Sequence, residues 1–332
     1  TMSLAKKNLT LDELKSGIIT GDRLILSQAI TLCESQLPED QRSATQLIDS
    51  ILSHTGTSLR IGITGIPGVG KSTFIEAFGL FLIKKGHKIA VLTIDPTSTL
   101  NQGSILGDKT RMNELSQNRN AYIRPSPTRG HLGGISEKTR ENMLLCEAAG
   151  FDVILIETVG VGQSEVAVKD LSDFLLLLMI SGAGDELQGI KRGLMELTDM
   201  ILVNKSDGEN IEESNHTKMV FEQALHYFPT NINNWKVPVE TISSRQPTNL
   251  DQVWKYINEY ITLTKTNDYF YTNRKHQNLQ WFREGLSNQL LQYVFQNPKL
   301  SNKKKEIEQA IQEGKKSVKS GLEALLKQVF DQ

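Results

Sequence analysis

Short apolar runs separated by longer amphipathic stretches occupy the chain between about residues 59 and 263. Each run is apolar at successive positions, which is typical of strands that are covered on both faces. The stretches between the runs have the length of helices, so they favour βα crossovers and a mainly parallel sheet flanked by helices. The six expected strands are LRIGIT, KIAVLTI, FDVILI, FLLLLMI, MILVN and VPVETI.

Helical patterns flank this α/β region on both sides. Apolar residues recur among polar ones from about Leu9 to His54, and Thr10 with Glu13 matches a capping box. After Asn267 the sequence is polar and helical, so we expect this tail to pack on the main domain or on another copy of the chain. The expected divisions are a helical N-terminal extension, a central domain and a helical C-terminal arm, at residues 1–55, 56–265 and 266–332.

Charge and composition restrict the function classes. The 332 residues include 37 basic and 38 acidic side chains, and this balance argues against a bulk electrostatic grip on nucleic acid or on an anionic membrane. The longest plainly apolar run, Phe174 to Ile180, is far too short to cross a bilayer. We therefore expect a soluble intracellular protein that binds neither nucleic acid nor membrane.

Cysteine and histidine usage gives no sign of a metal-carrying site. Cys33 and Cys146 form neither a disulfide framework nor a C-x-x-C pair, and the six histidines lack ligand spacing. A reducing compartment fits this usage, either the bacterial cytoplasm or, in a eukaryote, the mitochondrial matrix.

A complete phosphate-binding loop follows the first expected strand. Residues 65–72 read GIPGVGKS, which matches the G-x-x-x-x-G-K-S pattern, and a helix-like stretch follows. The glycines let backbone N–H groups turn around phosphate oxygens, and the helix N-terminus adds its positive end. Lys71 is expected to bridge the β- and γ-phosphates and Ser72 to bind Mg²⁺. The nucleotide-contacting residues expected here are Gly65, Ile66, Pro67, Gly68, Val69, Gly70, Lys71, Ser72 and Thr73.

Polar, loop-forming residues follow every expected strand. Ligands of open α/β sheets bind beyond the carboxyl ends of the strands, so these segments are expected to line one site. They are the phosphate loop and residues 95–98, 157–160, 181–185, 204–207 and 243–244.

The segment NKSD, Asn204 to Asp207, matches the N-K-x-D pattern of guanine-specific proteins. The Asp207 carboxylate can accept two hydrogen bonds from guanine, whereas adenine would leave it unpaired. Lys205 can cover the face of the base, and the Asn204 amide can tie the loops together. Backbone N–H groups of Ser243, Ser244 and Arg245 are expected to face the guanine oxygen. We therefore expect GTP and GDP as ligands in preference to ATP.

The segment ETVGVGQSE, residues 157–165, departs from the D-x-x-G-Q form of a hydrolytic switch. Glu157 replaces the usual Asp, and Val161 replaces a water-positioning Gln. Gly160 can still donate its N–H to the γ-phosphate. Because Val161 cannot orient water, we expect slow hydrolysis that rises when a partner or another segment completes the site, with Gln163 as a distant substitute.

These residues together make the chain similar to the MeaB/ArgK-like methylmalonyl-CoA mutase-associated GTPases, a family that includes the human protein of methylmalonic aciduria type A. The similarity covers nearly the whole chain. Its blocks are GDRLILSQAITLCES, GITGIPGVGKST, VLTIDPTS with GSILGDKTRM, RPSPTRGHLGGIS, ETVGVGQSE and GDELQGIKRGLMELTDMILVNKSD.

The resemblance implies a P-loop GTPase of the signal-recognition and MinD-like class. Such a protein works as a homodimer, partly through its C-terminal arm, and serves an adenosylcobalamin-dependent acyl-CoA mutase, foremost methylmalonyl-CoA mutase. It gates cofactor loading and protects or reactivates the mutase, so cobalamin is expected only through the partner.

The resemblance also assigns catalytic positions. Lys71, Asp95, Asp108 and Glu157 correspond to the phosphate and magnesium machinery, with Ser72 and the three acids as metal ligands. Residues 182–191, GAGDELQGIK, correspond to a further switch. Gln188 and Lys191 are the polar side chains by which this switch would reach the site. The alternative interpretation of residues 182–191 is an ordinary βα loop that leads into an amphipathic helix.

Two departures from the family pattern are small, namely NKSD for NKAD and a Ser-Ser pair for Ser-Ala. Three other functions remain open at this point. These are a small-molecule or protein kinase of the ArgK transport type, a metallochaperone GTPase, and a nucleotide-binding module without turnover.

Overall fold

The computed structural model describes residues 9–94, 112–125, 132–158, 164–181, 192–228 and 233–330. The chain divides into two units, residues 1–277 and 278–332, which are described separately. Several positions singled out in the sequence lie outside the described residues. They are Asp95, Asp108, Gly160, Val161, Gln163, Gln188 and Lys191.

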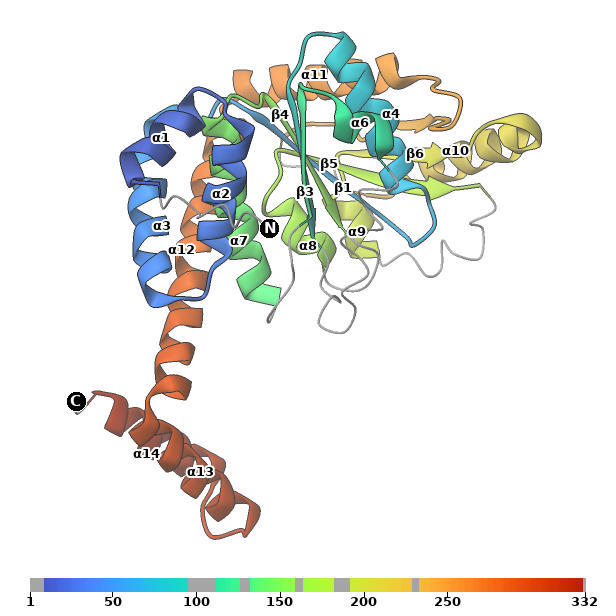
Figure 1. The fold of residues 1–332 in the computed structure, drawn as a ribbon. Coiled ribbons are helices and arrows are strands. Elements are labelled where there is room, and N and C mark those ends of the chain that lie inside the picture. Colours follow the sequence, from blue (N-terminus) through green and yellow to red (C-terminus); the bar gives the residue numbers. More distant parts are fainter. Residues whose placement is uncertain are drawn as a thin grey trace, which may run out of the picture. The chain divides into compact units, whose positions relative to one another are not determined.

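A seven-stranded sheet forms the centre of the first unit (Figure 1). Every described strand pair is parallel, in the order β3-β2-β4-β1-β5-β6-β7, which confirms the predicted parallel sheet. The strand that leads into the phosphate loop, β1, therefore lies in the interior of the sheet. The strands are β1 (Leu59–Gly65), β2 (Ile89–Ile94), β3 (Ala121–Pro125), β4 (Val153–Thr158), β5 (Phe174–Ile180), β6 (Met200–Asn204) and β7 (Val239–Thr241).

The strand β3 was not predicted from the sequence. It has five residues, AYIRP, and pairs only with β2 at one edge of the sheet. Its last two residues, Arg124 and Pro125, are only partly buried, so it lacks the continuous apolar run of the interior strands. Edge strands tolerate proline and charge because one side of the backbone is not paired.

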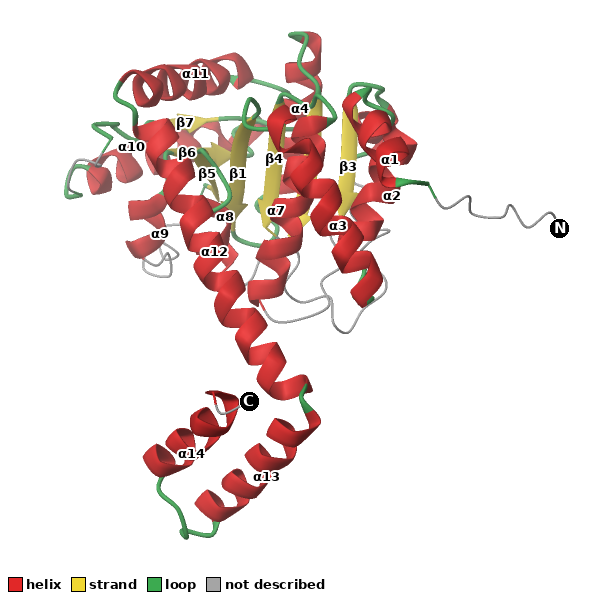
Figure 2. Cartoon of the chain, turned by 90° about the vertical axis from the view of Figure 1, so that its left-hand side faces the viewer, coloured by secondary structure: helices red, strands yellow, loops and turns green. Residues whose placement is uncertain are grey.

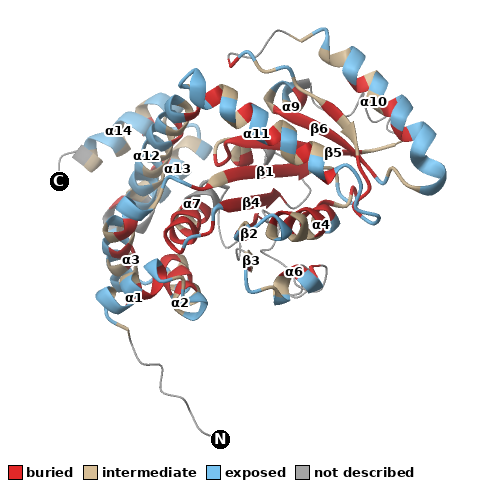
Figure 3. Cartoon of the chain, turned by 90° about the horizontal axis from the view of Figure 1, so that it is seen from above, coloured by how far each residue is buried: buried red, intermediate tan, exposed pale blue. Residues whose placement is uncertain are grey.

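Helices cover both faces of the sheet (Figure 2). Alternate residues of β5 explain why its sequence is apolar throughout: Leu176 packs toward one face and Leu177 toward the other. Figure 3 shows the interior strands buried between helices whose outer surfaces are exposed. One face is covered by α4 (Lys71–Lys84), α6 (Asn113–Gln117) and α11 (Leu250–Thr266). The other is covered by α7 (Leu132–Ala148), α8 (Ser164–Lys169), α9 (Arg192–Leu197) and α10 (Ile211–Leu225).

Three N-terminal helices pack against α7 and share a hydrophobic core with it. Glu13 accepts a hydrogen bond from the Thr10 backbone N–H at 2.8 Å, and Thr10 Oγ1 accepts the Glu13 N–H at 3.2 Å, so the predicted capping box is confirmed. Ile18, Ile30 and Leu47 are fully buried in this core. The elements are α1 (Leu11–Ile19), α2 (Arg23–Glu34), α3 (Pro38–Ile51), η1 (Leu52–His54) and, after β6, η2 (Gly208–Asn210).

The second unit consists of α12 (Tyr269–Gln296) from Asn278 onward and a helical hairpin of α13 (Pro298–Gln312) and α14 (Val318–Phe330). A Cβ at Gly321 would lie 2.9 Å from side-chain atoms of Ile307 and Ile311, so the two helices of the hairpin approach closely. No described helix is long and apolar enough to cross a membrane.

A buried ion pair joins the start of α12 to the sheet within the first unit. Arg274 donates from Nε and Nη2 to the two carboxylate oxygens of Asp173, each at 2.7 Å, and from Nη1 to the Gly56 carbonyl at 2.7 Å. Burial alone would lower the pKa of Arg274, but hydrogen bonding to Asp173 and its charge raise the pKa overall. The Asp173 side chain is 1% exposed, so this guanidinium neutralises a buried charge at the amino-terminal edge of β5.

Replacing Arg274 with Met is expected to lower the free energy of unfolding by about 3 kcal/mol, because Asp173 would be left as a buried, unpaired charge. Lys255→Met is the control, since the Lys255–Glu259 pair is exposed and such pairs contribute about 0.5 kcal/mol or less. Denaturant unfolding of both variants measures the difference. Equal stabilities would contradict a structural role for this ion pair.

Candidate nucleotide-binding site

The phosphate loop connects β1 to α4 at the carboxyl edge of the sheet, and its backbone requires glycine at two closely packed positions. Gly65 has φ +148°, and a Cβ there would lie 2.4 Å from the Leu178 carbonyl oxygen of β5. Gly70 has φ +97°, and its Cβ would lie 2.8 Å from Asn204 Nδ2. The loop therefore passes close over β5 and reaches the end of β6.

The amino end of α4 combines backbone donors with a buried ammonium group. The Phe74 N–H donates to the Gly70 carbonyl at 2.9 Å, so the N–H groups of the preceding residues lie at the open end of the helix. Lys71 is 8% exposed, and its Nζ donates to the carbonyls of Gly65 at 2.7 Å and Ile66 at 3.1 Å. Positive charge and backbone donors thus converge where an anion would bind.

Two predicted magnesium ligands lie side by side. Ser72 Oγ donates a hydrogen bond to Glu157 Oε1 at 3.1 Å, and Glu157, the next-to-last residue of β4, is 4% exposed. A hydroxyl and a carboxylate are the hard oxygen donors that Mg²⁺ prefers, and a nucleotide-bound Mg²⁺ needs only one or two of them from protein. In the described ranges no group of three or more His, Cys, Asp or Glu side chains could hold a metal.

The side chain of Asn204 connects the phosphate loop to two other loops. It is 1% exposed; its Nδ2 donates to the Val69 carbonyl at 2.9 Å, and its Oδ1 accepts from Ser244 Oγ at 2.8 Å. Lys205 adds a second link, from Nζ to the Gly68 carbonyl at 2.9 Å, and adopts a positive φ of 62°. The predicted tie between the loops is therefore present.

Asp207 is oriented by a contact that sequence analysis missed. Ser243 Oγ donates to Asp207 Oδ2 at 2.5 Å and accepts the Gln246 N–H at 3.0 Å. Ser243 is fully buried, so its hydroxyl holds one oxygen of the carboxylate in place. The only sequence signal for this contact is a serine directly after the last strand.

The backbone donors expected after β7 are used differently from the prediction. The Ser243 N–H donates to Thr248 Oγ1 at 3.1 Å, and the Ser244 N–H donates to Asn204 Oδ1 at 3.3 Å. Arg245 is exposed. The Ser243 N–H therefore stabilises the loop after β7, and the Ser244 N–H joins that loop to Asn204 at the end of β6. The sequence pattern specifies neither of these hydrogen bonds.

The described part of the predicted site is brought together in one place. Hydrogen bonds link the phosphate loop with the ends of β4 and β6 and with the loop after β7. Ile66 is partly buried, and Pro67 and Thr73 are exposed on the same loop and helix start. The remaining site positions named from the sequence fall in the ranges that are not described.

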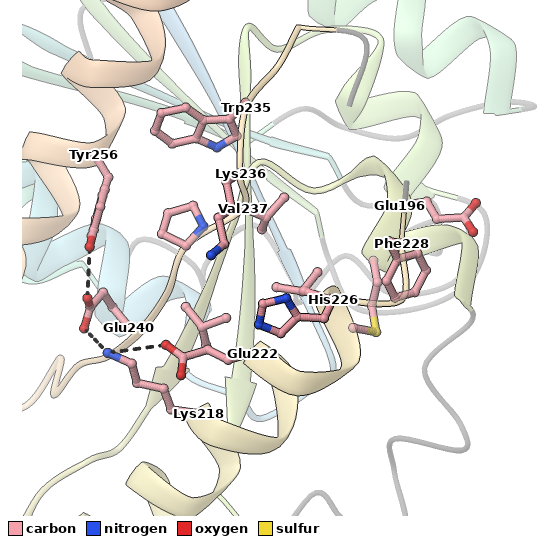
Figure 4. A pocket seen from close by; sticks show the side chains of 14 residues that line it. Glu196, Lys218, Glu222, His226, Phe228, Trp235, Lys236, Val237, Glu240 and Tyr256 are labelled. Carbon is pink, nitrogen blue, oxygen red and sulfur yellow. Dashed lines mark hydrogen bonds and ion pairs between the residues drawn. The ribbon is translucent and has the colours of Figure 1, made fainter. Parts of the chain in front are cut away.

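A separate cavity of about 1020 Å³ lies beside the edge strand β7 (Figure 4). In its wall, Lys218 pairs with Glu240 at 2.9 Å, and Tyr256 donates a hydrogen bond to Glu240 at 3.4 Å. None of the predicted nucleotide-binding residues lines it. The cavity is therefore distinct from the loops at the carboxyl edge that carry the predicted nucleotide-binding residues.

Both cysteines are buried free thiols. Burial raises the pKa of Cys33 to about 12 and raises the pKa of Cys146 as well. Both thiols therefore stay protonated and unreactive at neutral pH.

Comparison with known proteins agrees with this geometry. A family model described as "Methylmalonyl Co-A mutase-associated GTPase MeaB" matches residues 26–299. The chain is 43% identical over 316 residues to "GTPase ArgK" of Escherichia coli (strain K12), covering 95% of this chain and 96% of that protein. It is 38% identical over 332 residues to "Methylmalonic aciduria type A homolog, mitochondrial" of Mus musculus, covering 97% and 80%. A crystal structure of "LAO/AO transport system kinase" has a TM-score of 0.78 and 36% identity, covering 98% and 99%.

Replacing Gly70 with Ala tests the contact between the phosphate loop and Asn204. Gly86→Ala is a matched control, because Gly86 has φ +96° and a Cβ there would meet nothing within 4 Å. Both variants are expected to lose about 1 kcal/mol of stability from backbone strain. Only Gly70→Ala is expected to lose GDP affinity, by about tenfold or more, in a calorimetric titration. Equal GDP affinities in the two variants would contradict the role of this contact.

Proposed function

Because the chain belongs to the family of methylmalonyl-CoA mutase-associated GTPases, we propose that it is a GTP-hydrolysing chaperone of an adenosylcobalamin-dependent acyl-CoA mutase, foremost methylmalonyl-CoA mutase. It gates loading of the cofactor and protects or reactivates the mutase, and cobalamin is bound by the partner. The description of the matching family, which names methylmalonyl-CoA mutase, supports this partner. The observation that carries the GTP part is the Asn204 amide, which joins the phosphate loop to the loop that holds Asp207.

Guanine recognition rests on Asp207 in this proposal. Ser243 fixes Asp207 Oδ2, so the carboxylate is held in one orientation before a base arrives. Guanine presents a ring N–H and an amine to such a carboxylate, whereas adenine presents neither there and would cover the carboxylate without donating a hydrogen bond to it. Lys205, tied to the Gly68 carbonyl, has the aliphatic length to cover one face of the base.

Hydrolysis would depend on charge compensation by the described residues. The Lys71 ammonium neutralises charge that develops on the β- and γ-phosphate oxygens, and backbone N–H groups of the loop hold the phosphates in line. Mg²⁺ would be held by Ser72 and Glu157, with Asp95 and Asp108 as further ligands, and would supply additional charge compensation. Glu157 lies against Ser72, where it can position a ligand of the metal or a water molecule.

We further propose that intrinsic hydrolysis is slow. Val161 offers no group that can orient water, so completion of the site falls to a partner or to Gln188 and Lys191 of the segment 182–191. Gly160 would report the γ-phosphate through its backbone N–H. A slow GTPase that a partner accelerates suits a timing role in cofactor loading.

Self-association is the second part of the proposal. The second unit carries apolar side chains that are about half exposed or more, at the spacing of a helical stripe along α12. A second copy of the chain would bury this stripe, so we assign dimerisation to a C-terminal arm at residues 266–332. The other proposed parts of the chain are a helical extension at residues 1–55 and a GTPase domain at residues 56–265. The exposed residues are Leu279, Phe282, Leu286, Leu290 and Tyr293.

The cellular location belongs to the proposal as well. Relatives from mouse and Caenorhabditis elegans are named mitochondrial. We place the protein in the bacterial cytoplasm, or in the mitochondrial matrix if its source is eukaryotic.

Replacing Asp207 with Asn tests guanine recognition. The amide nitrogen would donate a hydrogen bond where guanine also donates, so GTP affinity is expected to fall about a hundredfold. Xanthosine triphosphate carries a carbonyl at that position and is expected to bind the variant better than GTP does. Ser243→Ala keeps the Asp207 carboxylate but removes the hydroxyl that donates a hydrogen bond to it, and its GTP affinity is expected to fall only about fivefold. Unchanged GTP affinity in Asp207→Asn would contradict this assignment.

Replacing Glu157 with Ala tests the hydrolytic role. The variant is expected to lose about tenfold or more in kcat for GTP while its GTP affinity changes less. Glu240→Ala, which removes a carboxylate of β7 that lies outside the predicted nucleotide site, is the control. Wild-type turnover should stay well below about 10 per second and rise when the purified mutase is added.

Phosphate release separates this function from its enzyme rival. A kinase, as in the name of the structural relative, would transfer phosphate stoichiometrically to an acceptor. Free phosphate released from GTP alone supports the GTPase, and transfer to an acceptor without free phosphate would contradict it. No change in turnover, and no nucleotide-dependent binding, with any adenosylcobalamin-dependent acyl-CoA mutase would contradict the chaperone role.

Replacing Leu286 with Glu tests self-association. The introduced charge is expected to convert a dimer to a monomer in sedimentation or light-scattering measurements, because it lies in the middle of the apolar stripe. Gln292→Glu changes an exposed polar residue of the same helix that lies off the stripe, and should leave the dimer intact. A wild-type protein that is monomeric at micromolar concentration would contradict the proposed dimer.

A further inference from the structure

The loop between β7 and α11 is closed at its neck by Thr248. Its Oγ1 accepts the Ser243 N–H at 3.1 Å, and its own N–H donates to the Ser243 carbonyl at 3.2 Å. The two hydrogen bonds make an antiparallel bridge between these residues. Ser243 is fully buried whereas Thr248 is exposed, so a surface residue fixes the backbone of a residue inside the site.

Asn249 fastens the same loop one residue further on. Its Nδ2 donates to the Thr241 carbonyl at the end of β7, at 2.8 Å. Asn249 has a φ of 59°, in the left-handed region that asparagine tolerates better than most residues. It directly precedes α11, yet its side chain makes no capping hydrogen bond to that helix. The neck of the loop is therefore held by two successive residues, Thr248 and Asn249.

All polar groups of Ser243 have partners, and one of these partners lies outside the loop. The N–H and the carbonyl pair with Thr248, and Oγ accepts the Gln246 N–H at 3.0 Å. The hydroxyl proton is donated to Asp207 Oδ2. Because an occupied lone pair leaves a hydroxyl less freedom to rotate, this proton is directed at the carboxylate. Thr248 is thus connected to Asp207 through a single residue, Ser243.

We propose that Thr248 is a positioning residue for guanine recognition. It fixes the backbone of Ser243, and the Ser243 hydroxyl then holds Asp207 in one orientation. The inference rests on the proposed function, in which the Asp207 carboxylate accepts two hydrogen bonds from guanine. A carboxylate held in place pairs with both donors at once, whereas one that can rotate loses part of this gain to ordering. Thr248 therefore contributes to selectivity for guanine rather than to the grip on phosphate.

Replacing Thr248 with Val removes the hydroxyl at nearly constant side-chain shape. GDP affinity in a calorimetric titration is expected to fall about threefold, as for loss of one partly exposed hydrogen bond. Thr248→Ser keeps the hydroxyl and is expected to stay close to wild type. Thr262→Val is the matched control, because the Thr262 hydroxyl is exposed and donates to the Asn258 carbonyl within α11. This control should leave GDP affinity unchanged.

Two further measurements separate positioning from a general loss of loop stability. The first is a double-mutant cycle with Ser243→Ala, for which about a fivefold loss of GDP affinity is expected. Adding Thr248→Val to Ser243→Ala should lower the affinity no further, because the hydroxyl through which Thr248 acts is already gone. The second is a titration with IDP, whose base lacks the exocyclic amine of guanine. Thr248→Val should weaken GDP more than IDP, so the ratio of the two affinities is expected to fall about twofold.

Asn249→Gly provides a second variant if Thr248→Val does not fold. Glycine keeps the left-handed backbone but removes the tie to Thr241, which loosens the neck that Thr248 closes. The ratio of GDP to IDP affinity is expected to fall in this variant too. Asn234→Gly is its matched control, because Asn234 also has a φ of 59° and an exposed side chain.

The outcomes distinguish the inference from the function on which it rests. Additive losses in the cycle would make Thr248 a stabiliser of the loop alone and would overturn the inference. Equal losses of GDP and IDP affinity in Thr248→Val, or in Asn249→Gly where that variant is needed, would also overturn it. A wild-type protein that binds ADP as tightly as GDP, or an Asp207→Asn variant with unchanged GDP affinity, would instead contradict guanine recognition and with it the proposed function.

Discussion

The buried amide of Asn204 is the contact on which the nucleotide site depends. The phosphate loop leaves β1 and Asn204 ends β6, and β5 lies between these strands in the sheet. The two halves of the site are therefore not neighbours through sheet hydrogen bonds. The Asn204 side chain, 1% exposed, makes the buried connection by donating to the Val69 carbonyl and accepting from Ser244, and Lys205 adds an exposed link to the Gly68 carbonyl. Leaving such buried groups unpaired costs about 1–3 kcal/mol each, so the loops are stable chiefly in this joined arrangement.

Other features of the site follow from this contact. Gly70 must lack a side chain because Asn204 Nδ2 occupies that space, and the loop must cross β5 closely, which requires Gly65. Ser243 and Asp207 then sit in the loops that Asn204 holds against the phosphate loop. Charge needed for stability is kept at the opposite edge of the sheet, where Arg274 neutralises Asp173. Substitutions at one edge should therefore alter nucleotide affinity, and those at the other should alter stability.

The sequence predicted the elements whose signals are local. All six expected strands are present, and five of them are interior strands that helices cover on both faces, which explains their continuous apolar runs. The sixth, β7, is a three-residue edge strand whose last two residues are only partly buried. The edge strand β3 escaped prediction because Arg124 and Pro125 interrupt the apolar pattern, and nothing requires an edge strand to be apolar throughout.

Contacts between distant segments were harder to predict. The G-x-x-x-x-G-K-S and N-K-x-D spacings encode backbone shapes, so their presence at one edge followed from sheet topology. The hydroxyl of Ser243 acts on a partner 36 residues away, which no local spacing encodes. Backbone donors of Ser243 and Ser244 were assigned to guanine, but the structure gives them to Thr248 and Asn204.

Calorimetric titration of GDP into Asn204→Ala tests the central claim most directly. The variant loses the donor to Val69 and the acceptor for Ser244, so the account predicts a GDP affinity about 30- to 100-fold below that of wild type. Asn204→Asp retains the acceptor but places a carboxylate oxygen against the Val69 carbonyl, and is expected to be no better. A folded Asn204→Ala protein that binds GDP within about twofold of wild type would contradict the claim that this amide joins the site.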